Sequence, residues 1–162
     1  GIAVTAVQLL NAYCAFANGG YVMQPYVVKQ VVSSSGEPLY EGKPHVLGRP
    51  IRAETAATMR LLLEGVTELG GTARRAAVEN YTVAGKTGTA QMSVPGGYSS
   101  TDYWASFVGF CPAEAPVFGV IIVIQRPKQI HTGGTVAAPA FGRITQQIAH
   151  YLEIPPDAME EP

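Results

Sequence analysis

Three segments in the second half of the chain carry the pattern of β-strands, and they constrain the fold more than any other feature. They are residues 81–90, 103–111 and 117–125, which are rich in β-branched and aromatic side chains. The last two are separated only by residues 112–116, a stretch that contains two prolines. A link that short predicts that these two strands form an antiparallel hairpin.

The connection between the first two strands, residues 91–102, is longer and contains Gly96, Gly97 and several serines. We expect a loop there. A connection of that size in a compact domain is usually mobile, functional or both.

Helices are predicted before the strands. Residues 6–17 follow a capping box of Thr5 and Gln8, and they are apolar almost all round, so we expect this helix to be buried on most sides. A second helix is predicted over residues 53–69, and the two glycines that follow, Gly70 and Gly71, should end it. A short helical turn should follow.

Two further segments complete the prediction. Residues 21–51 indicate an exposed hairpin followed by a connector, and a last helix follows Gly133 and Gly134, with Pro139 in its first turn. Strands with apolar residues on both faces need cover on both sides. The predicted fold class is therefore α+β, with a three-stranded or slightly larger antiparallel sheet packed between helices.

The composition excludes several classes of protein. Apolar residues make up 47% of the chain and charged residues 14%, which is normal for a folded domain and wrong for a disordered one. The net charge of −1 gives no reason to expect nucleic acid as a partner. No segment has the roughly 18–20 uninterrupted apolar residues that a membrane helix needs.

Neither the cysteines nor the histidines favour a metal, and no cofactor is expected. Cys14 and Cys111 are too few for a disulfide scaffold and have no CxxC spacing, so both are predicted to be buried thiols. His45, His131 and His150 are scattered without ligand spacing.

The chemistry of the chain concentrates in Lys86-Thr87-Gly88-Thr89. A lysine inside an apolar strand is costly unless it faces a cleft or a partner, and the glycines at 85 and 88 often mark the close approach of a ligand or another backbone. Alternation places Lys86 and Gly88 on one face and the two threonines on the other. One ammonium, two hydroxyls and free edge amides would suit an anionic substrate. A surface lysine beside threonines of high β propensity is the alternative reading.

This tetrapeptide resembles the third motif of the penicillin-binding proteins and serine β-lactamases. Four other segments resemble the class B, cell-wall-synthesising transpeptidases, so that the resemblance covers essentially residues 1–153. These segments are residues 1–5 with Gln8 and Leu9, Asn18-Gly-Gly20 with Pro25, residues 70–73, and residues 133–139 with Phe141. The resemblance implies the carboxy-terminal part of a transpeptidase domain with a partial β-lactamase/transpeptidase-like fold. Residues 154–162 would be a frayed acidic tail.

The resemblance also implies a role for each residue of the motif. Lys86 would lie at the cleft, help to position a serine of the second motif and attract the substrate carboxylate. The hydroxyls of Thr87 and Thr89 would bind the terminal carboxylate of a peptidoglycan stem peptide, or the matching carboxylate of a β-lactam. The Thr89 amide would be one of two oxyanion-hole donors. Gly88 would let the ligand lie against the strand, and Gly85 would keep the strand approachable.

Two more residues extend the predicted site. Gln91 continues the same strand edge, where it would touch the substrate. Trp104 begins the second strand, where it would belong to the core or to the wall of the cleft.

The chain departs from the family's pattern in two motifs. No Ser or Thr is followed three positions later by Lys, so the nucleophile motif Ser-x-x-Lys is absent, and no Ser-x-Asn motif is present. In the family both precede the part that this chain resembles. We therefore expect no catalytic nucleophile or base in this chain, and no covalent chemistry from it alone.

Three functions remain open. The first is part of a penicillin-binding D,D-transpeptidase; the second is part of a β-lactamase or β-lactam sensor; the third is a non-catalytic binding or scaffolding module. The expected ligand is a stem peptide or a β-lactam. The expected protein partner is the missing half of the domain or a second copy, because an apolar sheet edge should be exposed. The family implies the extracytoplasmic face of the bacterial cytoplasmic membrane, with an anchor that these residues do not include.

Overall fold

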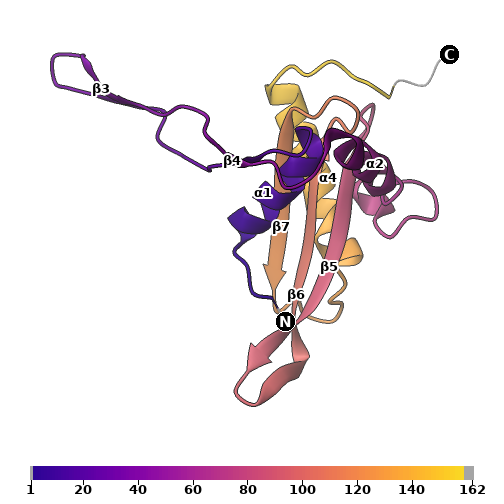
Figure 1. Ribbon diagram of the computed structural model, residues 1–162. Helices are drawn as coiled ribbons and strands as arrows, with labels where there is room; N and C mark the ends of the chain where they lie inside the picture. The colour runs from indigo at the N-terminus through magenta and orange to yellow at the C-terminus, as the bar shows by residue number, and fades with distance from the viewer. Residues whose placement is uncertain (1, 159–162) are drawn as a thin grey trace.

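A three-stranded antiparallel sheet forms the body of the molecule, as predicted. The computed structural model describes residues 2–158. In it β5 (Ala84–Val94), β6 (Gly97–Cys111) and β7 (Phe118–Gln125) pair in the order β5-β6-β7. The tight link between β6 and β7 makes the expected hairpin, and the long strands run the length of the body (Figure 1).

The predicted loop over residues 91–102 is wrong, because β5 and β6 continue through it as a hairpin. Only two residues separate the end of β5 at Val94 from the start of β6 at Gly97. Gly96 (φ 86°) and Gly97 (φ 154°) adopt a backbone conformation that favours glycine, which allows the tight reversal. This hairpin projects beyond the sheet at the bottom of Figure 1.

Helices cover both faces of the sheet. On one face α3 (Gly133–Val136) and α4 (Ala138–Tyr151) pack against β5, β6 and β7, with the rings of Phe107 and Phe141 4.6 Å apart. On the other face α1 (Ala6–Ala17) and α2 (Ala53–Glu64) pack around Phe110. The predicted α+β arrangement, a sheet between helices, is confirmed.

Helix α1 has the predicted bounds but not the predicted burial. Its capping box is complete: the Thr5 amide donates to Gln8 Oε1 (2.9 Å), and the Gln8 amide donates to Thr5 Oγ1 (3.2 Å). Ala15 is nevertheless its single buried residue, and Val7 is 57% exposed. The reason is that α1 contacts the sheet and α2 on one side, while no described residue covers its opposite side.

Helix α2 ends at Glu64, five residues before the predicted end. Thr67 explains the early stop, because its hydroxyl lies 3.0 Å from the Glu64 carbonyl and 3.0 Å from the Val83 carbonyl. The side chain thus ties the turn to the start of β5. The short turn that follows is a 3₁₀ helix, η1 (Arg74–Ala76), close to its predicted place.

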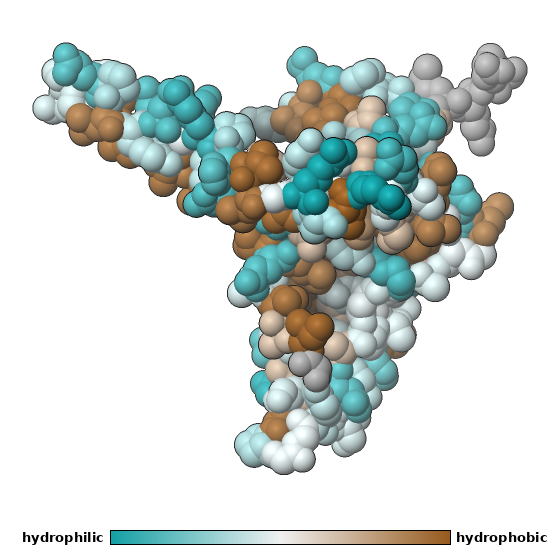
Figure 2. Space-filling model, viewed as in Figure 1, coloured by the Kyte–Doolittle hydropathy of each residue, from teal (hydrophilic) through white to brown (hydrophobic). Residues whose placement is uncertain are grey.

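Residues 22–48 form a slender arm that stands away from the body (Figure 1). β1 (Val22–Met23) pairs with β4 (Val46–Gly48) at its root, and β2 (Gln30–Val32) pairs with β3 (Pro38–Glu41) farther out. The predicted exposed hairpin is present, with a shorter first strand than expected. In the space-filling view apolar side chains are visible along the arm (Figure 2).

The end of the described chain packs against the root of β5. The Tyr81 hydroxyl donates to the carbonyl of buried Ile154 (2.7 Å), and the Thr82 amide donates to Asp157 Oδ1 (2.8 Å). Residues 154–158, predicted as part of a frayed tail, therefore make defined contacts; residues 159–162 lie outside the described part. Among residues 2–158 no helix is both long and apolar enough to cross a membrane.

Candidate functional site

The Lys-Thr-Gly-Thr sequence lies on an edge strand. β5 has only β6 as a neighbour in the described chain, so its other edge is free. Lys86 is paired with Val108 and Gly88 with Ser106, without irregularity across the four residues. The register therefore keeps the alternation that the sequence predicts: Lys86 and Gly88 share one face of the sheet, and Thr87 and Thr89 share the other.

The phase of the hydrogen bonding decides which amides of β5 are free. The Arg126 amide donates to the Tyr103 carbonyl (2.9 Å), so the backbone groups of Tyr103 point toward β7. Backbone direction alternates along an antiparallel strand, so those of Ser106 point toward β5 instead. The N–H and C=O groups of its partner Gly88 therefore point toward β6. Those of Thr87 and Thr89 point the other way, to the free edge of β5.

Both threonine side chains face segments that the sequence singles out. Thr89 Oγ1 accepts a hydrogen bond from the Gly133 amide (3.1 Å), and Thr87 Oγ1 lies 3.5 Å from Thr72 Oγ1. A Cβ built on Gly134 would lie 3.4 Å from Thr87 Cγ2. The fold thus brings residues far apart in the sequence together behind β5.

Lys86 is exposed and forms no ion pair with any residue in the described range. Its Nζ lies 3.2 Å from Thr87 Oγ1 and 3.3 Å from the Thr87 carbonyl. An ammonium that bonds only to a neighbouring threonine keeps its charge available for an anion.

Gly85, just before the motif, and Gly88 within it are required by packing inside the sheet. A Cβ on Gly85 would lie 2.6 Å from the Phe107 ring, and a Cβ on Gly88 would overlap the Ser106 hydroxyl. These glycines are therefore needed for packing within the sheet as well as for the predicted role of leaving room for a ligand. Strand β6 itself occupies the space that side chains at these positions would need.

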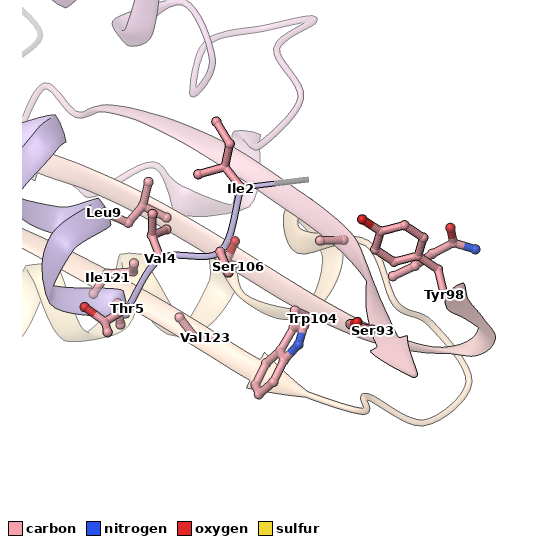
Figure 3. A pocket seen from close by; sticks show the side chains of 14 residues that line it. Ile2, Val4, Thr5, Leu9, Ser93, Tyr98, Trp104, Ser106, Ile121 and Val123 are labelled. Carbon is pink, nitrogen blue, oxygen red and sulfur yellow. The ribbon is translucent and has the colours of Figure 1, made fainter. Parts of the chain in front are cut away.

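An open groove of about 840 Å³ lies beside the motif on the α1 face of the sheet. Figure 3 shows Val4 and Leu9 of the amino-terminal segment above Ser106, Ile121 and Val123 of the sheet. The groove continues onto the β5–β6 hairpin, where it is lined by Gln91, Ser93, Tyr98 and Trp104.

The sequence predicted two of the groove residues and missed others. Gln91 and Trp104, which is 38% exposed, both line the groove, and this places Trp104 in its wall rather than in the core. Ser106 and Tyr98 were not predicted. A polar residue two positions before Val108 in an apolar strand indicates Ser106, whereas Tyr98 lies in residues 91–102, for which the sequence predicts a loop.

Neither cysteine thiol is activated in this fold. Burial, with a smaller contribution from Asp157, raises the pKa of the Cys111 thiol to about 12, and burial raises the pKa of the Cys14 thiol. Both thiols stay protonated at neutral pH. The residues described here contain no group of three or more His, Cys, Asp or Glu side chains placed to hold a metal ion.

Comparison with known proteins gives a consistent result. The family described as "Penicillin binding protein transpeptidase domain" matches residues 1–146. "Stage V sporulation protein D" of Bacillus subtilis is 37% identical over 158 residues, which cover 96% of this chain and 24% of that protein. "Probable peptidoglycan D,D-transpeptidase PenA" of Neisseria meningitidis is 33% identical over 157 residues, covering 96% of this chain and 25% of that protein.

A crystal structure of penicillin-binding protein 3 from Mycobacterium tuberculosis, complexed with ampicillin, is similar to this fold. The TM-score is 0.88 at 32% identity, over 100% of this chain and 38% of that one. A transpeptidase domain of penicillin-binding protein 3 from Burkholderia pseudomallei gives 0.78 at 34% identity, over 97% of this chain and 45% of that one. This chain spans about a quarter of the length of the curated relatives named above.

Proposed function

Because this chain belongs to the penicillin binding protein transpeptidase domain family, we propose that it supplies the substrate-binding strand and part of the oxyanion hole of a peptidoglycan D,D-transpeptidase that also binds β-lactams. The observation that carries the proposal is the free edge of β5 at Lys86, Thr87 and Thr89. In this proposal residues 1–153 are the carboxy-terminal part of the transpeptidase domain.

The geometry of Thr89 supports a role in binding a carboxylate and an oxyanion. Its Oγ1 already accepts the Gly133 N–H, so its own O–H remains available to donate to a substrate carboxylate. Its backbone N–H lies on the free edge, where it would stabilise the charge that develops on the attacked carbonyl oxygen. Loss of one such donor typically costs roughly 3–4 kcal/mol of transition-state stabilisation.

Lys86 would contribute charge. Its ammonium is exposed beside the Thr87 hydroxyl, and together they form a pair of donors for the terminal carboxylate of a stem peptide or for the carboxylate of a β-lactam. It would also help to orient the serine of the second motif. The nucleophilic serine would come from sequence preceding these residues, since no Ser-x-x-Lys occurs in them.

The relatives' names place them in peptidoglycan synthesis and sporulation, so we also propose the extracytoplasmic face of the bacterial membrane as the location. The groove beneath Val4 would accept the rest of the domain. Its lining is largely apolar, and such a surface is usually covered in a complete domain.

Labelling with a fluorescent penicillin, read by intact mass, tests this proposal. The 162-residue chain alone should carry no adduct, and the complete domain with its preceding sequence should carry one on a serine. Lys86→Ala in the complete domain should reduce the acylation rate at least tenfold. Lys43→Ala, which removes an exposed lysine of the distant arm, is the matched control and should label normally. An adduct on the isolated chain would show that the assignment of the nucleophile is wrong.

A further inference from the structure

The segment between β7 and α3, residues 126–132, crosses the α4 face of the sheet; we refer to it as the crossing segment. It starts at the edge strand β7, with the Arg126 amide bonded to the Tyr103 carbonyl of β6. It ends at Gly133, whose amide is bonded to Thr89 of β5. In Figure 1 this part of the chain passes across the lower end of the sheet.

Two side-chain contacts hold the crossing segment to β6. The rings of His131 and Tyr103 are stacked, with centroids 4.0 Å apart and planes inclined by 11°. Arg126 Nε lies 3.2 Å from Asp102 Oδ2, in an ion pair whose side chains are 62% and 37% exposed. The ion pair is solvated and should contribute little, whereas stacked rings also bury apolar area.

The backbone of the crossing segment needs such support. Arg126 (φ 49°) and Gln129 (φ 69°) both have left-handed backbone conformations, although neither is a glycine. Residues of this kind persist only where their surroundings hold them. The stack at His131 acts on the same short segment, two residues before Gly133.

The far end of the segment packs directly against the motif. Gly133 is buried, and a Cβ on it would overlap the carbonyl oxygens of Ser106 and Gly88 and lie 3.1 Å from the Gly88 amide nitrogen. Its backbone therefore rests directly on the back of Gly88. A shift of this end would disturb Thr89, whose Oγ1 accepts the Gly133 N–H and whose own amide lies on the free edge of β5.

We propose that His131 is a positioning residue, which through its stack on Tyr103 keeps Gly133 pressed against Gly88 and Thr89 and so fixes the Thr89 amide and hydroxyl for acyl transfer. Only the effect of His131 on acyl transfer rests on the proposed function. Holding the segment in place is a property of the isolated chain. His131 is exposed, so its replacement should leave the core intact.

Amide hydrogen exchange on the 162-residue chain tests the contact without any catalysis. In His131→Ala the Gly133 amide, bonded to Thr89 Oγ1, should exchange about tenfold faster, because local opening becomes easier. His131→Phe keeps a ring on Tyr103 and should exchange as the natural chain does. The matched control is His45→Ala, on the distant arm. Unchanged exchange in His131→Ala would overturn the proposal.

Penicillin acylation of the complete domain tests the consequence for the site. His131→Ala should lower the acylation rate constant about tenfold with little change in the initial non-covalent binding constant, and His131→Phe should restore it to within about twofold. Thermal unfolding of both variants should match that of the natural protein.

The two measurements separate the possible failures. Faster exchange with unchanged acylation would overturn the positioning role, because the segment would then move without affecting Thr89. A natural domain that is not labelled at all would contradict the proposed function, and hydrogen exchange would still decide whether His131 holds the segment.

Discussion

The two faces of the sheet differ in how completely the chain fills them. On the α4 face Phe107, Phe141 and Ala138 are fully buried in one continuous core. On the α1 face a smaller cluster around Phe110 is followed by an open groove, in which Val123 is 43% exposed. The same three strands supply both faces, so strand sequence alone does not set burial. Burial depends on the elements that pack against each face.

This difference suits the proposed function. The filled face carries α3, which backs Thr89 through Gly133, and so gives the motif a rigid support. The open face carries Lys86 and the groove, where a substrate and the rest of the domain would have to enter.

Phe107→Ala should destabilise the chain by about 3–5 kcal/mol, because it removes a fully buried ring that packs on Phe141. Val123→Ala on the groove face should cost about 1 kcal/mol or less, since that side chain is already partly in water. Urea unfolding followed by circular dichroism measures both. Equal losses would show that the two faces do not differ in packing.

Tyr81→Phe should cost about 1–2 kcal/mol. The hydroxyl it removes donates to the carbonyl of Ile154, and that carbonyl would be left buried without a partner. Tyr151→Phe, on an 86% exposed residue, is the matched control and should be neutral. The same urea titration reports both values, and a neutral Tyr81→Phe would mean that residues 154–158 do not stabilise the filled face.

Trp104→Glu should weaken self-association of the isolated chain about tenfold, or about 1.4 kcal/mol, because it places a charge in the apolar groove. Analytical ultracentrifugation over a range of concentrations measures this. Tyr151→Glu, a charge at an exposed position outside the groove, is the control. A natural chain that stays monomeric at high concentration would contradict the view that the groove face is an association surface.

The two thiols should differ in their dependence on pH. The pKa of Cys111 is raised from 9.0 to about 12 in the folded chain, so the folded state retains a proton that the unfolded state loses above pH 9. Its contribution to stability is complete below pH 9 and is lost as the pH rises from about 9 to about 12. Cys111→Ala should flatten that loss.

Alkylation compares how accessible the two thiols are on the two faces of the sheet. Cys14 is only partly buried, so iodoacetamide should modify it before Cys111 in the folded chain. Mass spectrometry of peptides after timed quenching measures the order. Faster modification of Cys111 would mean that the filled face opens more readily than the groove face.

Local patterns predicted much of this fold. The capping box of Thr5 and Gln8 sets the start of α1, and runs of β-branched and aromatic residues indicate the three strands, because both signals depend on residues near in sequence. Sequence resemblance also selected residues 70–73 and 133–139 as companions of the motif, and contacts with Thr87 and Thr89 bring both segments to it.

The errors came from interactions between distant residues. The β5–β6 hairpin was missed because residues 91–102 have loop-like composition, and it is pairing across the hairpin that makes them strands. Helix α2 was predicted too long because Thr67 is bonded to Val83, which lies sixteen residues away. The stack of His131 on Tyr103 could not be predicted, because no pattern in the sequence around either residue indicates the other as its partner.

Local sequence specifies the identity and alternation of residues 86–89: a cation, two hydroxyls and a glycine on one strand. The tertiary structure decided that the Thr87 and Thr89 amides face the free edge while the hydroxyls turn to α3. The direction of the amides depends on which residues of β6 bond to β7, as the Arg126–Tyr103 hydrogen bond shows. The direction of the hydroxyls depends on Gly133, which bonds Thr89 from 44 residues away. Hydrogen bonds between strands join residues distant in sequence, so no local pattern specifies them.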